Sequence, residues 1–159
     1  INFMINSIQL SDYSNKVYGY LKNDNSELIE NISFSHLDSG DNHIIIELKS
    51  PNQNIDTNLF FSSQRDMLTV GFDMFHCHYD NFSGQDFDKE IKKALECFYK
   101  ILKEELFVVN AGGGITTLLT SEEINILEAG QKLENFNYDN IKYYSVTSWS
   151  GNYDRMFKT

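Results

Sequence analysis

The stretch that decides the fold runs from Phe87 to Glu105 and reads F-D-K-E-I-K-K-A-L-E-C-F-Y-K-I-L-K-E-E. Apolar residues recur in it at steps of three and four, which is the spacing of one face of an amphipathic helix. Asp86 can cap the start of this helix, and lysines near its end complement the helix dipole. The sequence therefore predicts one long helix at about 87–105, whose apolar stripe packs on a sheet.

Short runs of strand-forming residues, separated by turn residues, surround this helix. The runs that we expect to form strands span 5–10, 16–21, 28–34, 43–48, 58–61, 67–79, 107–109, 115–119 and 141–146. Thr120 and Glu123 form a capping box that opens a second, short helix at about 121–129. This order predicts an α+β fold with a largely antiparallel sheet. Because no linker rich in Pro, Gly or Ser divides the chain, we expect a single domain of residues 1–159.

Charge and composition restrict the classes of partner. The chain has 13 Lys and Arg against 23 Asp and Glu, a formal net charge of −10. Surfaces that bind phosphate backbones or anionic membranes need the opposite balance, so nucleic acid and membranes are not expected as ligands. There is no run of about 18 apolar residues and no basic-then-apolar leader, and the two cysteines, Cys77 and Cys97, are too few for a disulfide scaffold. We expect a cytoplasmic protein.

The sharpest local motif is His76-Cys77-His78-Tyr79-Asp80. In one strand over 67–79, His76, His78 and Asp80 would project from the same side, and two imidazoles with a carboxylate can bind zinc or iron. A small metal-dependent enzyme that uses these three residues is therefore one candidate function. The metallohydrolase pattern is incomplete, however, because Asn81 follows Asp80. We favour imidazoles at the rim of the sheet, hydrogen-bonded to Asp80 or to backbone, and expect no catalytic residue, metal or cofactor.

The only tryptophan lies in a polar segment near the end of the chain. Trp and Tyr are enriched at the energetic centres of protein interfaces, which favours a partner-binding role for this segment. In the alternative interpretation, Trp149 covers an open edge of the core and Asp154 belongs to a structural turn. An acidic pair opens the second helix and adds to the candidate partner-binding residues, which are Trp149, Tyr153, Asp154, Glu122 and Glu123.

Several short motifs between residues 66 and 155 occur together. They are Leu68-Thr69-Val70-Gly71-Phe72, His76-Cys77-His78-Tyr79-Asp80, Ala94-Leu95, Gly112-Gly113 and Ser148-Trp149-Ser150-Gly151 with Tyr153-Asp154. This part of the chain resembles the immunity proteins encoded beside bacterial polymorphic toxins, including those of contact-dependent growth-inhibition systems. The resemblance implies a cytoplasmic protein without catalytic activity, which binds one cognate toxin domain and blocks it.

The charge of the chain suits one class of toxin in particular. Many delivered toxin domains are nucleases, which are basic because they bind phosphate. An acidic inhibitor can imitate the polyanion and associate quickly through electrostatic steering. We therefore expect a basic nuclease as the partner. A structural or regulatory domain with another partner is a third interpretation.

Overall fold

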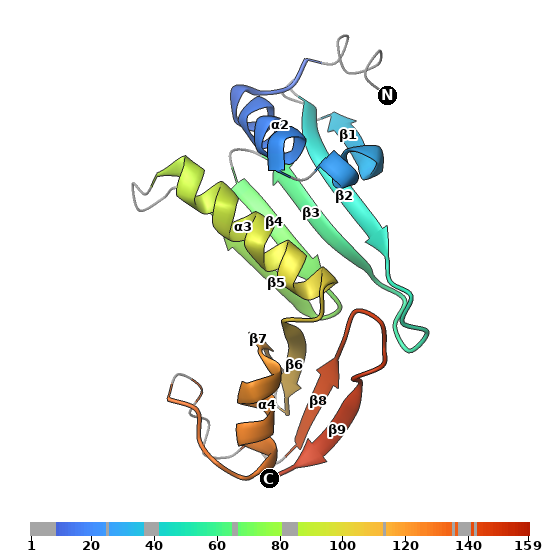
Figure 1. Cartoon of the computed structure of the whole chain (residues 1–159), viewed down its shortest axis with the longest axis vertical. Coiled ribbons are helices and arrows are strands. Elements are labelled where there is room, and N and C mark those ends of the chain that lie inside the picture. Colours follow the sequence, from blue (N-terminus) through green and yellow to red (C-terminus); the bar gives the residue numbers. More distant parts are fainter. Residues whose placement is uncertain are drawn as a thin grey trace. The chain divides into compact units, whose positions relative to one another are not determined.

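The computed structural model describes residues 9–24, 26–36, 42–64, 67–80, 86–112, 114–134, 136, 141 and 143–159. The chain divides into two compact units, each interrupted in sequence. Unit 1 consists of Ile1–Leu48, Asn58–Gly71 and His76–Phe98, and unit 2 of Lys49–Thr57, Phe72–Phe75 and Tyr99–Thr159. The expected α+β class is confirmed, because antiparallel sheets combine with helices (Figure 1). The expected single domain stays a prediction.

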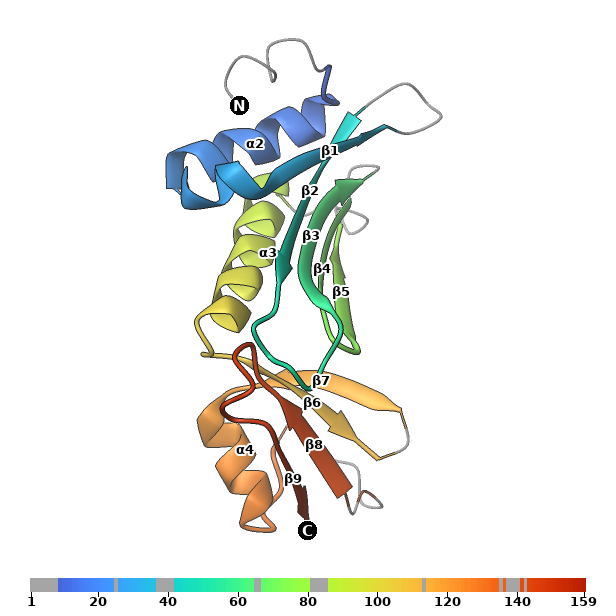
Figure 2. The same cartoon turned by 90° about the vertical axis from the view of Figure 1, so that its right-hand side faces the viewer.

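Unit 1 is built on a five-stranded sheet with the strand order β1-β2-β3-β4-β5. Helices α2 and α3 lie on the same face of this sheet (Figures 1 and 2). The elements are α2 (Asp12–Asp24), the 3-10 helix η1 (Ser26–Asn31), β1 (Ile32–His36), β2 (Asn42–Lys49), β3 (Asn58–Gln64), β4 (Met67–Phe72), β5 (Phe75–Tyr79) and α3 (Phe87–Leu102).

Helix α3 confirms the predicted long helix. Its stripe is buried, Leu95 and Phe98 included, and the rings of Phe98 and of Phe61 from β3 pack in a T-shaped arrangement at a centroid distance of 6.0 Å. Asp86 caps the helix, since its Oδ1 accepts a hydrogen bond of 3.0 Å from the backbone N–H of Asp88. The helix ends at Leu102, earlier than predicted, and is followed by a turn in which Glu104 has a φ of 58°.

The sequence prediction was wrong at the start of the chain. Residues 16–21, expected as a strand, belong to helix α2. Tyr13, Val17 and Leu21 are buried at a spacing of four, which is the helical period, and Ser11 Oγ accepts a hydrogen bond from the N–H of Ser14 at the helix start. The expected strand 28–34 is divided between η1 and β1, and residues 5–8 of the expected strand 5–10 lie outside the described residues.

The expected strand 67–79 is also corrected, because it is a hairpin of β4 and β5 with a turn at Asp73 and Met74. Asp73 adopts a φ of 53°, a left-handed conformation that Asp tolerates better than most residues. The turn contains no Gly or Pro, and the apolar alternation continues through it, so the sequence gives no sign of it. As a result, the histidines lie on a different strand from the buried Leu68 and Val70.

Unit 2 is built on a four-stranded antiparallel sheet with the strand order β7-β6-β8-β9. Its elements are β6 (Phe107–Ala111), β7 (Ile115–Leu119), α4 (Ser121–Glu128), β8 (Tyr143–Thr147) and β9 (Arg155–Lys158). The predicted hairpin, short helix and late strand are confirmed with small shifts at their ends, whereas β9 was not predicted. The capping box is present, with Glu123 N–H donating to Thr120 Oγ1 at 3.3 Å and Thr120 N–H to Glu123 Oε2 at 2.7 Å.

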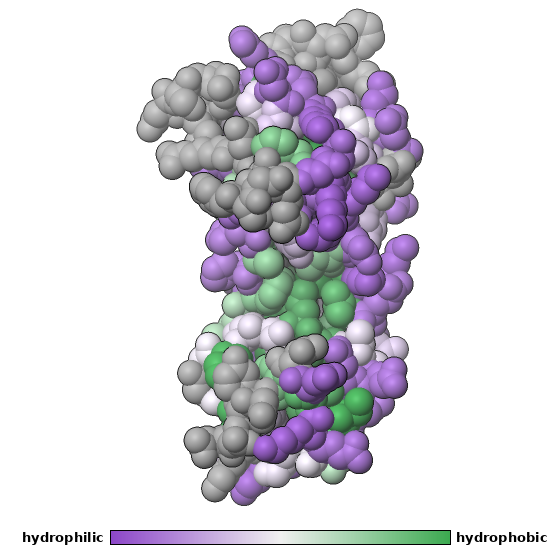
Figure 3. Space-filling model, turned by 90° about the vertical axis from the view of Figure 1, so that its left-hand side faces the viewer, coloured by the Kyte–Doolittle hydropathy of each residue, from purple (hydrophilic) through white to green (hydrophobic). Residues whose placement is uncertain are grey.

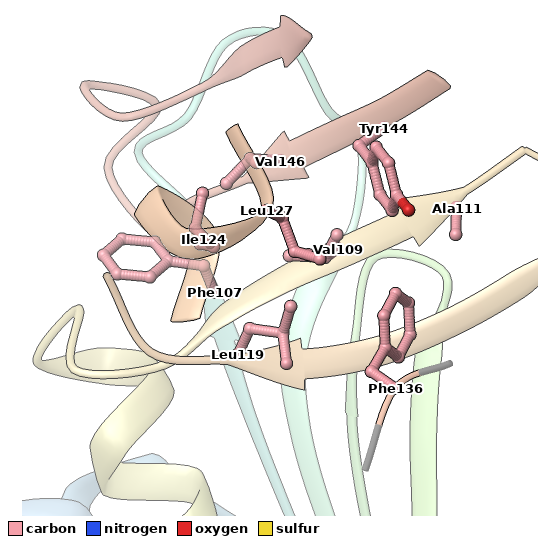
Figure 4. Close-up of a cluster of buried hydrophobic side chains, with 9 residues drawn as sticks. All are labelled: Phe107, Val109, Ala111, Leu119, Ile124, Leu127, Phe136, Tyr144 and Val146. Carbon is pink, nitrogen blue, oxygen red and sulfur yellow. The ribbon is translucent and has the colours of Figure 1, made fainter. Parts of the chain in front are cut away.

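Helix α4 covers one face of this sheet, which we call the inner face. Ile124 and Leu127 of α4 point toward the strands and complete a buried cluster (Figure 4). The cluster comprises Phe107, Val109, Ala111, Leu119, Ile124, Leu127, Phe136, Tyr144 and Val146. In the described residues of both units, no helix is both long and apolar enough to cross a membrane.

Candidate protein-binding surface

The side of the four-stranded sheet opposite α4 carries a different set of side chains. Successive strand residues point to opposite faces, so Tyr144 and Val146 enter the core while Tyr143 and Ser145 lie on the other side. The strand register places Ser145 beside Met156 and Asn110, and Tyr143 beside Lys158. We call this side the outer face and define it by Asn110, Tyr143, Ser145, Met156 and Lys158.

Large apolar side chains are exposed on the outer face. Tyr143 is 62% exposed and Met156 is 85% exposed, and they help to line an open hollow of about 430 Å³. Met74, 60% exposed, lies beside them, because Asn110 Nδ2 donates a hydrogen bond of 3.1 Å to its Sδ. Together with Tyr153, these are the exposed large hydrophobic residues of the described chain, and all four belong to unit 2. Figure 3 draws the molecule from a different side, on which hydrophobic residues are exposed between hydrophilic ones.

The ammonium group of Lys158 borders Tyr143 on this face. The Nζ of Lys158 lies 5.3 Å from the centroid of the Tyr143 ring, within range of a cation–π interaction. Within the described parts of the chain, Lys158 makes no ion pair. The described residues of the outer face therefore combine aromatic, thioether and amide groups with the ammonium group of Lys158 at its edge.

Asp154 lies in the loop before β9 and accepts four hydrogen bonds. Its Oδ1 accepts from the N–H of Ser148 at 2.7 Å and from Ser148 Oγ at 3.0 Å, and its Oδ2 accepts from Asn52 Nδ2 at 2.8 Å and Asn54 Nδ2 at 3.1 Å. Burial acts to raise the pKa of Asp154, but the hydrogen bonds from Ser148, Asn54 and Asn52 outweigh it and hold the pKa below its ordinary value. The carboxylate thus fastens the loop before β9 to the loop after β2.

The two aromatic residues of the same loop differ in exposure. Trp149 is half-buried, its ring packs against Phe72 at 5.7 Å between centroids, and its carbonyl accepts a hydrogen bond of 2.7 Å from Ser50 Oγ. Tyr153 is 51% exposed and meets Phe107 at 5.6 Å in an edge-on arrangement. Tyr153 therefore has exposed surface to offer a partner, whereas Trp149 and Asp154 hold the loop together.

Glu122 and Glu123 lie in the first turn of α4. Glu123 is engaged in the capping box, since its carboxylate accepts from both the N–H and the Oγ1 of Thr120, whereas Glu122 is exposed. Because α4 covers the inner face, this acidic pair lies across the sheet from the outer face. The predicted partner-binding residues thus fall into two groups, the loop before β9 and the start of α4.

His76 and His78 lie in β5, an edge strand of the unit 1 sheet, and both side chains are exposed. Their ring centroids are 5.5 Å apart, and His78 Nδ1 lies 3.0 Å from Thr69 Oγ1 on β4. Over the described ranges, no group of three or more His, Cys, Asp and Glu side chains could hold a metal ion, so Asp80 does not complete a three-residue site there.

The intervening residues of β5 alternate with the histidines. Cys77 and Tyr79 are half-buried. Burial, assisted by a hydrogen bond with Cys97 of α3, raises the pKa of Tyr79. Cys77 and Tyr79 therefore lie on the opposite face of the strand from the exposed imidazoles of His76 and His78.

Met74 and Met156 were not among the candidate residues from the sequence. Met156 lies in β9, a strand of four residues in which only Met156 and Phe157 are apolar, too short a pattern to identify. Met74 lies in the turn between β4 and β5, which no Gly or Pro in the turn indicates. The alternation of Tyr143 and Ser145 with Tyr144 and Val146 is the one signal that could have located the outer face.

Comparison of the chain with protein-family models, with curated proteins and with solved structures found no match. The functional interpretation of the outer face consequently depends on its own geometry and chemistry.

Proposed function

We propose that this protein is a non-catalytic immunity protein, which binds a cognate toxin domain in the bacterial cytoplasm and thereby neutralises it. The outer face carries the proposal, because Tyr143, Met156 and Met74 expose large apolar side chains side by side. Exposed apolar patches with a polar border mark interaction surfaces in soluble proteins. Tyr and Met are also enriched at interfaces, and Met adapts its shape to a partner.

The charge of the chain supports a basic partner, and we propose a nuclease as the toxin. The formal net charge is −10, and unit 1 contributes the larger share of the excess acidic residues. A nuclease must bind phosphate and is basic where it does so. Opposite net charges accelerate the encounter of two proteins by steering, while the contacts formed afterwards set how long the complex lasts.

The test is co-expression with the toxin domain encoded by the neighbouring upstream gene, followed by a growth-rescue assay and co-purification. The protein should restore growth and co-purify with the toxin domain in a one-to-one complex. Tyr143→Ala combined with Met156→Ala should weaken binding by about 10- to 100-fold, the range expected when central interface side chains are truncated. Asn125→Ala is the matched control, because Asn125 is exposed on α4, across the sheet from the outer face.

Two adverse outcomes have different meanings. Failure to bind or neutralise the toxin domain would refute the immunity proposal itself. Binding that is equally strong in the double variant and in the Asn125→Ala control would refute the assignment of the outer face. Folding of the double variant is verified by circular dichroism, and we expect it to be retained because both side chains are exposed.

A further inference from the structure

The two exposed histidines of β5 are a second surface feature, which the proposed function does not use. His76 and His78 are separated by one residue in an extended strand, so they project from the same face. Both are exposed, and β5 lies at the edge of its sheet, which leaves this position open to solvent. The pair therefore presents two imidazoles from one face of a regular strand.

The spacing of the rings suits joint coordination of one ion. Zinc–nitrogen bonds to imidazole are about 2.0–2.1 Å long, so two imidazoles that share an ion have ring centroids about 4.5–6.5 Å apart. The observed centroid distance of 5.5 Å falls within this interval, and the rings are inclined at 65° instead of being stacked. This spacing is compatible with one nitrogen of each ring binding the same ion.

The hydrogen bonding of the pair also fits metal ligation. His78 Nδ1 pairs with Thr69 Oγ1 at 3.0 Å, which fixes the ring and leaves Nε2 as the ligand atom. Ligating histidines typically use their second nitrogen for such a bond, and the bond orients the ring. Among the described residues, none forms a hydrogen bond with a ring nitrogen of His76, so within this part of the chain either nitrogen can serve as a ligand.

We propose that His76 and His78 form a two-histidine chelate for a late first-row divalent ion, with Thr69 as a positioning residue. Imidazole ligands suit Cu²⁺, Ni²⁺ and Zn²⁺, and the order of affinities places Cu²⁺ first. Water completes the coordination sphere. Mg²⁺ and Ca²⁺, which prefer oxygen ligands, do not compete at this site. This inference is independent of the proposed immunity function.

The test uses tag-free full-length protein titrated with Cu²⁺ by calorimetry, with electron paramagnetic resonance to count the coordinated nitrogens. One ion should bind per chain, with hyperfine structure from two imidazole nitrogens. His76→Ala and His78→Ala should each lower the affinity by at least about 10-fold and remove one nitrogen from the spectrum, while Thr69→Val should lower it by up to about 10-fold. All three variants change exposed or half-buried positions, so their folding is checked by circular dichroism.

Cys77→Ser is the matched control, because it alters the intervening residue of the same strand but on its other face. It should leave both the affinity and the spectrum unchanged. Affinity lost in Cys77→Ser but retained in the histidine variants would assign the ion to the thiol and overturn the proposal. A dissociation constant weaker than about 1 mM, or equal affinities in the native protein and His76→Ala, would also overturn it.

Discussion

Replacing Asp154 with alanine should destabilise unit 2 by about 3 kcal/mol. The substitution removes the acceptor of four hydrogen bonds between the loop before β9 and the loop after β2. Hydrogen bonds to a charged group contribute about 1.5–3 kcal/mol each, and a buried donor left unpaired costs about 1–3 kcal/mol. Asn52 is 2% exposed and suffers this penalty, whereas Asn54 is exposed and can bond to water. Because the carboxylate is itself partly exposed, the total stays well below the sum of the separate bonds.

Asp154→Asn tests the role of the charge separately. An amide at this position can still accept from Ser148, but its NH₂ group then faces the NH₂ groups of Asn52 and Asn54, so we expect a loss of about 2 kcal/mol. The folded protein holds the pKa of Asp154 below its ordinary value. Its stabilising effect is therefore complete above the unfolded pKa of about 3.9 and is lost as the pH falls through the folded pKa. The difference in stability between the native protein and Asp154→Asn should accordingly shrink below about pH 4.

Urea unfolding measures both effects. Trp149 is the only tryptophan and lies in the affected loop, so its fluorescence reports on unit 2, and circular dichroism reports on the whole chain. Coincidence of the two transitions is required before a two-state free energy is derived. Glu122→Ala, an exposed acidic residue of α4, is the control and should change stability by less than about 0.5 kcal/mol. An equally small change for Asp154→Ala would refute the reasoning that this carboxylate fastens the loops.

Three other predictions follow from the same structure. Leu95→Ala should lower the free energy of unfolding in urea by about 2–5 kcal/mol, because the Leu95 side chain lies in the buried stripe of α3. A loss below about 0.5 kcal/mol would mean that this stripe faces water. Gly151→Ala should lower the free energy of unfolding by about 1–3 kcal/mol in the same assay, because the φ of Gly151 is 81° and the added Cβ would lie 2.8 Å from Asn52 Oδ1. Unchanged stability would contradict the close packing of these two loops. In stopped-flow mixing with the toxin domain, the association rate should fall steeply with added salt while the dissociation rate changes little, and a salt-independent association rate would exclude electrostatic steering.

The two long helices show which parts of this fold a sequence can reveal. In α3 the apolar residues follow the helical period over four turns and the charges match the dipole, so the helix could be predicted from the sequence alone. In α2 the helical spacing of Tyr13, Val17 and Leu21 competes with an equally regular alternation from Val17 through Gly19 to Leu21. The β-branched Val17 and the aromatic Tyr18 and Tyr20 favour a strand by propensity. Tertiary packing favours the helix, because Val17 and Leu21 are fully buried in α2.

The candidate site was predictable in part for a comparable reason. Residues that are close in sequence, such as Trp149, Tyr153 and Asp154, could be grouped as one segment. The partners of Asp154, however, include Asn52, which lies far earlier in the chain and has no recognisable pattern. The exposure of Met156 depends on a strand pairing with β8, which neither of their short sequences specifies.

The charges and the exposed apolar side chains of this protein act over different distances. We therefore expect them to affect different steps of toxin binding. Charges act across a screening length of about 8 Å at physiological ionic strength, whereas apolar side chains contribute only where they lose water on contact. Most of the excess negative charge belongs to unit 1, and the exposed Tyr143, Met156 and Met74 belong to unit 2. If both features serve one partner, outer-face variants should raise the dissociation rate without altering the salt dependence of association. A variant of the outer face that changed this salt dependence would show instead that the acidic residues responsible for steering lie beside it.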